Sequence, residues 1–205
     1  TLASTTYVFT LVIATFVLGI GIGGLLAGRR GERHDPVRDL SRAQLALVVV
    51  LLIDWLLAPQ TQAIGSAFGG GFEATLLQST AMCAVLLLPA TILMGVLVPL
   101  LGRLYMARAG RGEGVGALYT LNTLGAVVGS VGVTIAFVPF LGASRSYLLL
   151  TGLAVASLWV YVRYREDASD RRVRSGAVSA TAVWLGCALL RLSLIHISEP
   201  TRLHC

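Results

Sequence analysis

Charged residues are scarce in this chain of 205 residues, and lysine is absent altogether. Only 13% of the residues are charged, whereas 56% are hydrophobic and the mean hydropathy is +0.80. A soluble domain carries charge at about a quarter of its positions. The scarcity of charge and the recurrence of long apolar runs exclude an ordinary soluble domain and favour an integral membrane protein.

Cysteine is also rare, and its placement argues against two classes of site. The three cysteines, Cys83, Cys187 and Cys205, form no CxxC or CxxH spacing, which speaks against a metal centre or a disulfide framework. No Ser/His/Asp set, Cys/His pair, carboxylate pair or phosphate-binding loop can be assembled from residues 1–191. The sequence therefore predicts no catalytic, cofactor-binding or metal site in this chain.

All sixteen basic residues are arginine, and they give the chain a net charge of +6. Such a balance is compatible with nucleic-acid binding. Here, however, the arginines lie in short segments between apolar runs, where a membrane protein places them to set its orientation. We therefore expect the lipid bilayer, and no nucleic acid, as the partner of this surface.

Six apolar runs organise the chain, and none alternates with a period of two as a membrane barrel strand would. A helix of about 20 residues crosses the hydrocarbon core. We expect an all-α, polytopic transmembrane helix bundle of about six spans. They cover residues 7–27, 43–58, 74–101, 115–141, 146–162 and 176–190.

Arginine alternates between the connections of these spans. Segments 28–42, 102–114 and 163–175 carry five, three and five arginines, whereas 60–73 carries none and 142–145 carries one. The positive-inside rule then predicts that 28–42, 102–114 and 163–175 are cytoplasmic. The expected location is the plasma (inner) membrane. Segment 60–73, which contains Gly69–Gly71, is expected to be a flexible connection or a re-entrant piece.

Polar groups inside membrane spans are costly and are the first candidates for function. Asp54 is the only acid inside an expected span, near Pro59; it is either a proton or cation site or an interfacial carboxylate in contact with water. Asn122 either forms part of a substrate or domain-contact site or makes an interhelical hydrogen bond that fixes packing. With Tyr119, it lies in the cytoplasmic third of its span, where packing or coupling is the favoured role.

Small residues one helical turn apart allow another helix to approach closely. Gly19 and Gly23 form such a pair in the first span, and Gly125 and Gly129 form one in the fourth. We expect all four to be helix-packing positions. Pro89 and Pro99 should kink the long third span, since each removes a helical hydrogen bond.

Three segments, in order, carry a family resemblance. They are Thr6–Phe9 with Phe16–Gly23, Leu88–Gly95 with Pro99, and Tyr119–Ala126 with Gly129 and Val138–Gly142. Together they resemble the membrane domain of the membrane-embedded spermidine synthase-like (polyamine aminopropyltransferase) family over residues 5–165. The resemblance implies a fused cytosolic domain that transfers an aminopropyl group from decarboxylated S-adenosylmethionine to putrescine. None of the transferase motifs is present in this chain, so activity is expected of the parent protein only.

A second resemblance competes with the first. Gly24–Arg33 is similar to the G-x-x-x-D-R-x-G-R-R loop of major-facilitator transporters, although Gly28 occupies the position of the Asp. The alternatives are therefore the membrane domain of a spermidine synthase-like protein, a fragment of a secondary transporter, and a helical scaffold without chemistry. The sequence indicates neither a substrate nor an oligomeric state.

Both ends of the chain are expected to be truncated. The sequence begins without methionine, and residues 192–205, which start LSLIHISEPTR, resemble a translated sequencing adapter. We expect this tail to be artefactual and to lie outside the fold. The family resemblance further implies a missing N-terminal helix and a missing C-terminal cytosolic domain as partners of the spans.

Overall fold

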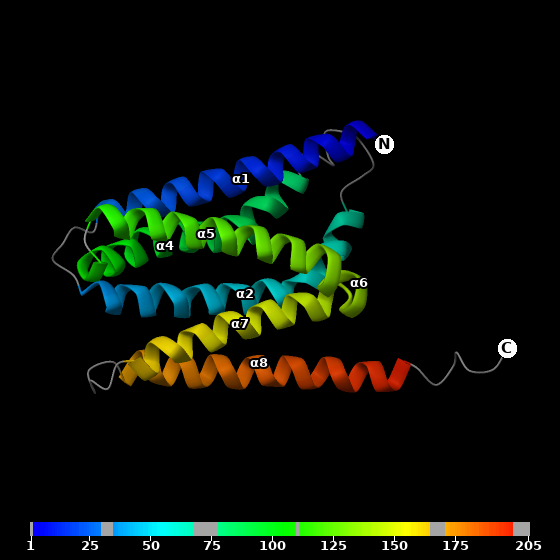
Figure 1. Cartoon of the computed structure of the whole chain (residues 1–205). Helices are drawn as coiled ribbons and strands as arrows, with labels where there is room; N and C mark the ends of the chain where they lie inside the picture. The colour runs from blue at the N-terminus through cyan, green and yellow to red at the C-terminus, as the bar shows by residue number, and fades with distance from the viewer. Residues whose placement is uncertain (1, 30–34, 68–77, 110, 165–170, 199–205) are drawn as a thin grey trace. The chain divides into compact units, whose positions relative to one another are not determined.

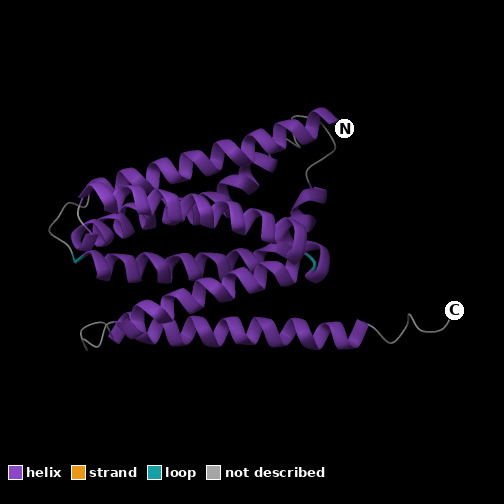
Figure 2. Ribbon diagram, viewed as in Figure 1, coloured by secondary structure: helices purple, strands orange, loops and turns teal. Residues whose placement is uncertain are grey.

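The computed structural model describes residues 2–29, 35–67, 78–109, 111–164 and 171–198. Within these ranges every residue except Asp35 and Gly142 is helical, and no strand occurs (Figures 1 and 2). The all-α prediction is therefore confirmed for the described part of the chain. Contacts divide the chain into two compact units, Thr1–Ser130 and Val131–Cys205.

Unit 1 is built around one central helix. It contains α1 (Leu2–Arg29), α2 (Pro36–Ala67), a helical turn at 78–82, the π-helical turn η1 (Cys83–Leu87), α4 (Leu88–Ala109) and most of α5 (Arg111–Gly132). Both α1 and α2 pack against α4. The buried apolar side chains come mainly from α2 and α4: Leu40, Ala43, Leu47, Val48, Leu52, Ala90, Val96 and Leu100.

Unit 2 continues the helix of α5 through a second π-helical turn, η2 (Val133–Phe137), and α6 (Val138–Leu141). Gly142 then reverses the chain with a φ of 77°, a left-handed conformation that glycine adopts without steric cost. Helices α7 (Ala143–Tyr164) and α8 (Arg171–Ser198) follow and pack against each other (Figure 1). The expected turn at 142–145 is thus a single residue long.

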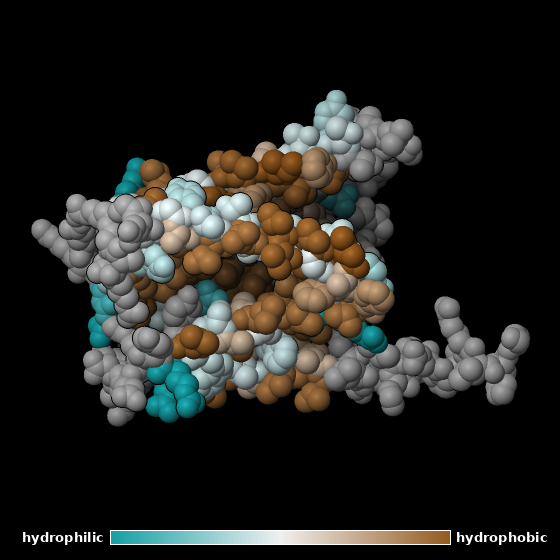
Figure 3. All heavy atoms as spheres, in the orientation of Figure 1, coloured by the Kyte–Doolittle hydropathy of each residue, from teal (hydrophilic) through white to brown (hydrophobic). Residues whose placement is uncertain are grey.

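Five helical stretches are long and apolar enough to cross a membrane, and each overlaps one of the first five expected spans. They are Thr6–Arg29, Pro36–Leu57, Gln78–Met106, Gly114–Leu141 and Ala143–Val160. Large apolar side chains are exposed along them, and Figure 3 shows many of these on one face. This pattern is compatible with a multi-pass membrane protein. The sixth expected span, 176–190, lies on α8 but is not among the five.

The helices are longer than the sequence predicts, and three expected connections are largely helical. Residues 36–42 of the expected loop 28–42 form the start of α2, because Pro36 fits the first helical position and a side-chain oxygen of Asp35 accepts a hydrogen bond from the Val37 N–H at 3.0 Å. Residues 60–67 continue α2. In segment 102–114, α4 runs to Ala109 and α5 begins at Arg111.

Other expectations fall partly outside the described residues. Gly69–Gly71 and the start of the third expected span, 74–77, lie there, as does much of segment 163–175. Helix α8 continues to Ser198 and so includes the first seven residues of the tail that was expected to be artefactual. Its backbone is helical up to that point, which differs from the expectation that the tail stands apart from the fold.

Candidate functional site

The closest contact between two helices in unit 1 joins α1 to α4 through their glycines. A Cβ atom added to Gly19 would overlap the Thr91 side chain, and one added to Gly23 would overlap the Ile92 carbonyl oxygen. The same added Cβ on Gly23 would lie 2.9 Å from both Cα and C of Gly95. Ordinary carbon–carbon contacts are about 3.5–4.0 Å. Only hydrogen fits at these positions, as the spacing of Gly19 and Gly23 predicted.

Helix α4 contributes a small residue of its own to this contact. A Cβ on Gly95 would overlap the Ile20 carbonyl oxygen and would lie 2.8 Å from Ile20 Cα. The approach is therefore reciprocal, because main chain meets main chain from both sides. We call the set Gly19, Gly23, Thr91 and Gly95 the α1–α4 glycine contact.

The one side-chain hydroxyl in this contact is already hydrogen-bonded. Thr91 is 3% exposed, and its Oγ1 donates within its own helix to the carbonyl oxygens of Leu87 and Leu88, at 2.9 and 3.0 Å. Such back-bonding satisfies a buried hydroxyl without a partner on the next helix. The contact can thus hold two helices together, but it offers no free acid, base or nucleophile for catalysis.

An arginine joins the same two helices near the end of α1. The Arg103 guanidinium on α4 donates a hydrogen bond to the Ala27 carbonyl oxygen at 3.0 Å. The last four carbonyls of a helix have no partner within that helix. A cation at this end also interacts favourably with the helix dipole. Arg103, which the sequence marked only as a loop charge, therefore caps α1.

Asp54 occupies a different position along its helix from the one expected. It is half-buried on α2, and α2 does not end near Pro59 but continues to Ala67. The carboxylate therefore lies 13 residues, or about 20 Å, before the end of the helix. The interpretation of Asp54 as a shallow interfacial group rested on an early helix end, and the longer helix removes that support.

Tyr119 and Asn122 lie on α5 one helical turn apart, and both are exposed; Tyr119 is 68% exposed. Added Cβ atoms on Gly125 and Gly129 would meet no described atom within 4 Å. The described structure therefore brings Gly19 and Gly23 against another helix but brings none to Gly125 or Gly129. Near its start α5 does contact α4: a Cβ on Gly114 would lie 3.2 Å from Met106 Cα.

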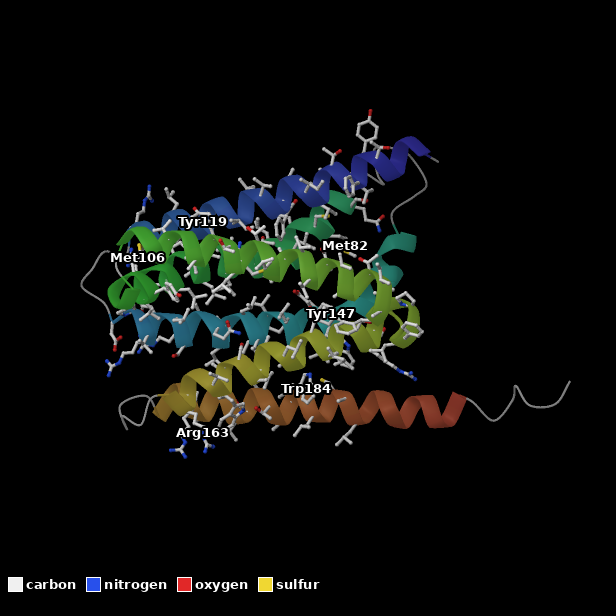
Figure 4. The ribbon with its side chains drawn as sticks, viewed as in Figure 1. Met82, Met106, Tyr119, Tyr147, Arg163 and Trp184 are labelled. Atoms are coloured by element: carbon white, nitrogen blue, oxygen red, sulfur yellow. The ribbon has the colours of Figure 1, made fainter. Side chains whose placement is uncertain are left out.

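In unit 2 two tryptophans connect α7 and α8. The Trp184 Nε1–H donates to the Leu148 carbonyl oxygen at 3.0 Å, and the Trp159 Nε1–H donates to Thr181 Oγ1 at 2.9 Å. Figure 4 shows Trp184 between the two helices. Gly152 makes room for the indole, since a Cβ there would lie 2.6 Å from Trp184 Cζ2. Sequence reasoning missed this pairing because nothing local relates Gly152 to Trp184.

Among the described residues no group of three or more His, Cys, Asp or Glu side chains is close enough to hold a metal ion. Cys83 and Cys187 are both buried, on η1 and α8 respectively. The arrangement that stands out is therefore a helix-packing site, with Asp54 as a separate acidic group. Comparisons with protein-family profiles, with curated proteins and with solved structures found no match to this chain.

Proposed function

We propose that this chain is a multi-pass helical membrane domain of a spermidine synthase-like protein, in the plasma (inner) membrane. In this role the chain anchors and positions a domain that transfers an aminopropyl group from decarboxylated S-adenosylmethionine to putrescine. Five helices of membrane-crossing length and hydropathy support the membrane part of the proposal. They also account for the exposed apolar side chains, which lipid would cover.

One observation carries the family part of the proposal. Two of the three segments that resemble this family meet each other, since Gly19 and Gly23 of the first pack on Thr91 and Gly95 of the second. Residues that hold helices together at van der Waals distance tolerate little substitution. Segments that share such residues with a family are therefore expected to share its helix packing.

Membrane topology is the first test of the proposal. Reporter fusions after Gly31 and Gly69, on either side of the second expected span, form a matched pair. We expect a cytoplasmic signal at Gly31 and a periplasmic signal at Gly69, because arginine is concentrated in the first segment and absent from the second. A periplasmic signal at Gly31 would overturn the proposed orientation.

The enzymatic part needs the complete protein that contains this chain. Purified in detergent, it should convert putrescine and decarboxylated S-adenosylmethionine to spermidine, measured by chromatography. The 205-residue chain by itself should show no such conversion. A complete protein that forms no spermidine and that binds neither substrate would exclude this assignment and leave the membrane domain without the proposed partner.

Asp54 favours a second candidate, a secondary transporter with an acidic coupling site. Its carboxylate lies well inside a helix whose first 22 residues form a candidate span. Buried acids in spans commonly mark ion pathways. Proteoliposomes with an imposed pH gradient and labelled putrescine as the probe test this candidate. Uptake that Asp54→Asn abolishes and Asp54→Glu retains would support it, whereas uptake unchanged by Asp54→Asn would remove Asp54 as the coupling group.

A further inference from the structure

Two π-helical turns occur in the described structure, and each stands in the same relation to a proline. The turn η1 spans Cys83–Leu87 and precedes Pro89, whereas η2 spans Val133–Phe137 and precedes Pro139. In each case the turn begins six residues before the proline and ends two before it. The repetition indicates a common physical cause.

Proline supplies that cause, because it lacks an N–H and its ring clashes with the carbonyl four residues earlier. A π turn contains one extra residue and moves that carbonyl aside. The hydrogen bonds agree with this account. The N–H of Leu88 donates to the carbonyl of Cys83, and that of Val138 donates to the carbonyl of Val133, each five residues back.

Proline alone does not produce the wider turn. Pro99 lies inside α4, and the four residues before it remain α-helical. The residue four positions before Pro99 is Gly95, which touches the main chain of Ile20. A wider turn there would break the α1–α4 glycine contact, so packing holds the α form. The surroundings of each proline thus decide the shape of its helix.

The two π turns differ in how they are held. Helix α1 packs against η1, and Cys83 at its start is buried. No residue of η2 is buried. The boundary between the two compact units falls at Ser130/Val131, inside one continuous helical stretch and two residues before η2 begins. The weakest point of this stretch therefore coincides with the point at which the chain passes from one unit to the next.

We propose that η2 is a hinge about which Val131–Cys205 turns relative to Thr1–Ser130, and that Pro139 keeps this hinge in its π form. The turn η1 has the same local chemistry, but α1 clamps it, so it does not act as a hinge. Sharp bends in helices are found at prolines and at π bulges, and η2 combines the two. A helix that crosses a unit boundary otherwise transmits motion as a rigid rod.

Spin-label distance measurements on the full chain in lipid nanodiscs test the hinge. One label pair, at Leu124 and Phe140, spans η2; the control pair, at Val115 and Val131, does not. All four side chains are exposed, at 56%, 83%, 39% and 51% respectively. Both pairs are 16 residues apart, which corresponds to about 24 Å along a regular helix. Cys83, Cys187 and Cys205 are replaced by Ala in the labelled background.

We expect a broader distance distribution for the η2 pair than for the control pair. Pro139→Ala should remove the excess width and turn Phe140 about the helix axis by about 100°, one residue step, because the α form becomes available. Pro99→Ala, the matched control, should leave the η2 pair unchanged. Equal widths in the parent chain, or an η2 distribution that Pro139→Ala does not narrow, would overturn the proposal. The parent comparison needs no proline variant, so it stands even if Pro139→Ala fails to fold.

Discussion

Gly23→Ala is expected to loosen the packing of α1 on α4. The added methyl carbon would lie 2.9 Å from Gly95 Cα and C, about 0.6–1.1 Å closer than a carbon–carbon contact allows. Main chain cannot rotate out of the way as a side chain can, so the helices must separate. Overpacking of this kind typically costs about 1–3 kcal/mol.

Helix α1 offers its own control. Gly21 and Gly24 lie on the same helix, and a Cβ on either would meet no described atom within 4 Å. At such open helical positions Gly→Ala stabilises by about 0.4–1 kcal/mol, because alanine restricts the unfolded chain. Gly21→Ala and Gly23→Ala make the same chemical change in the same helix. They should nevertheless shift the free energy of unfolding in opposite directions.

Reversible unfolding in mixed micelles, in which the denaturing detergent fraction is raised and helicity is followed by circular dichroism, measures this difference. Combining the two effects, we expect Gly23→Ala to be about 1.5–4 kcal/mol less stable than Gly21→Ala. Gly95→Ala should behave like Gly23→Ala, since its Cβ would meet the main chain of Ile20. Equal stability of Gly21→Ala and Gly23→Ala would show that α1 does not lie on α4 as described, and it would refute the reasoning.

Three further predictions concern single contacts. Gly152→Ala should cost about 1–3 kcal/mol and shift the fluorescence of Trp184, whose ring a Cβ would approach to 2.6 Å, whereas Gly186→Ala, with open space, should do neither. Arg103→Met should remove the hydrogen bond to the Ala27 carbonyl oxygen, at a cost of about 1.5–3 kcal/mol, and should speed backbone amide exchange in the last turns of α1. Arg145→Met, at an exposed site, is its control, and equal exchange in the two variants would argue against the cap. Gly125→Ala and Gly129→Ala should leave the unfolding free energy of the monomer unchanged or slightly raised, because nothing described lies within 4 Å of either Cβ; a loss above about 1 kcal/mol would reveal a partner on this face.

Local chemistry made some helix boundaries predictable and others not. The helical class followed from apolar runs without period-two alternation, and those runs coincide with the five long apolar stretches. Helix ends were placed too early because Pro and charged residues were interpreted as loop formers. Asp35-Pro36 instead starts α2, and α2 continues beyond Pro59. A proline or an arginine cannot by itself end a helix that its neighbours extend.

The same spacing of small residues had two different outcomes. Gly19 and Gly23 pack on α4, whereas Gly125 and Gly129 face no described atom. The sequence can mark both pairs as able to accept a neighbour, since that depends only on the absent side chain. Which pair receives one depends on where another helix lies, and the spacing does not contain that information.

The amino-acid sequence by itself determined the helical class, the apolar stretches and the positions at which close approach is sterically possible, because each depends on composition and periodicity along one helix. Tertiary structure alone decided that Gly95 and Thr91 complete the α1–α4 glycine contact, that Arg103 caps α1, and that Trp184 fills the space at Gly152. These pairs are far apart in the chain, and only the packing of one helix on another brings their atoms within reach.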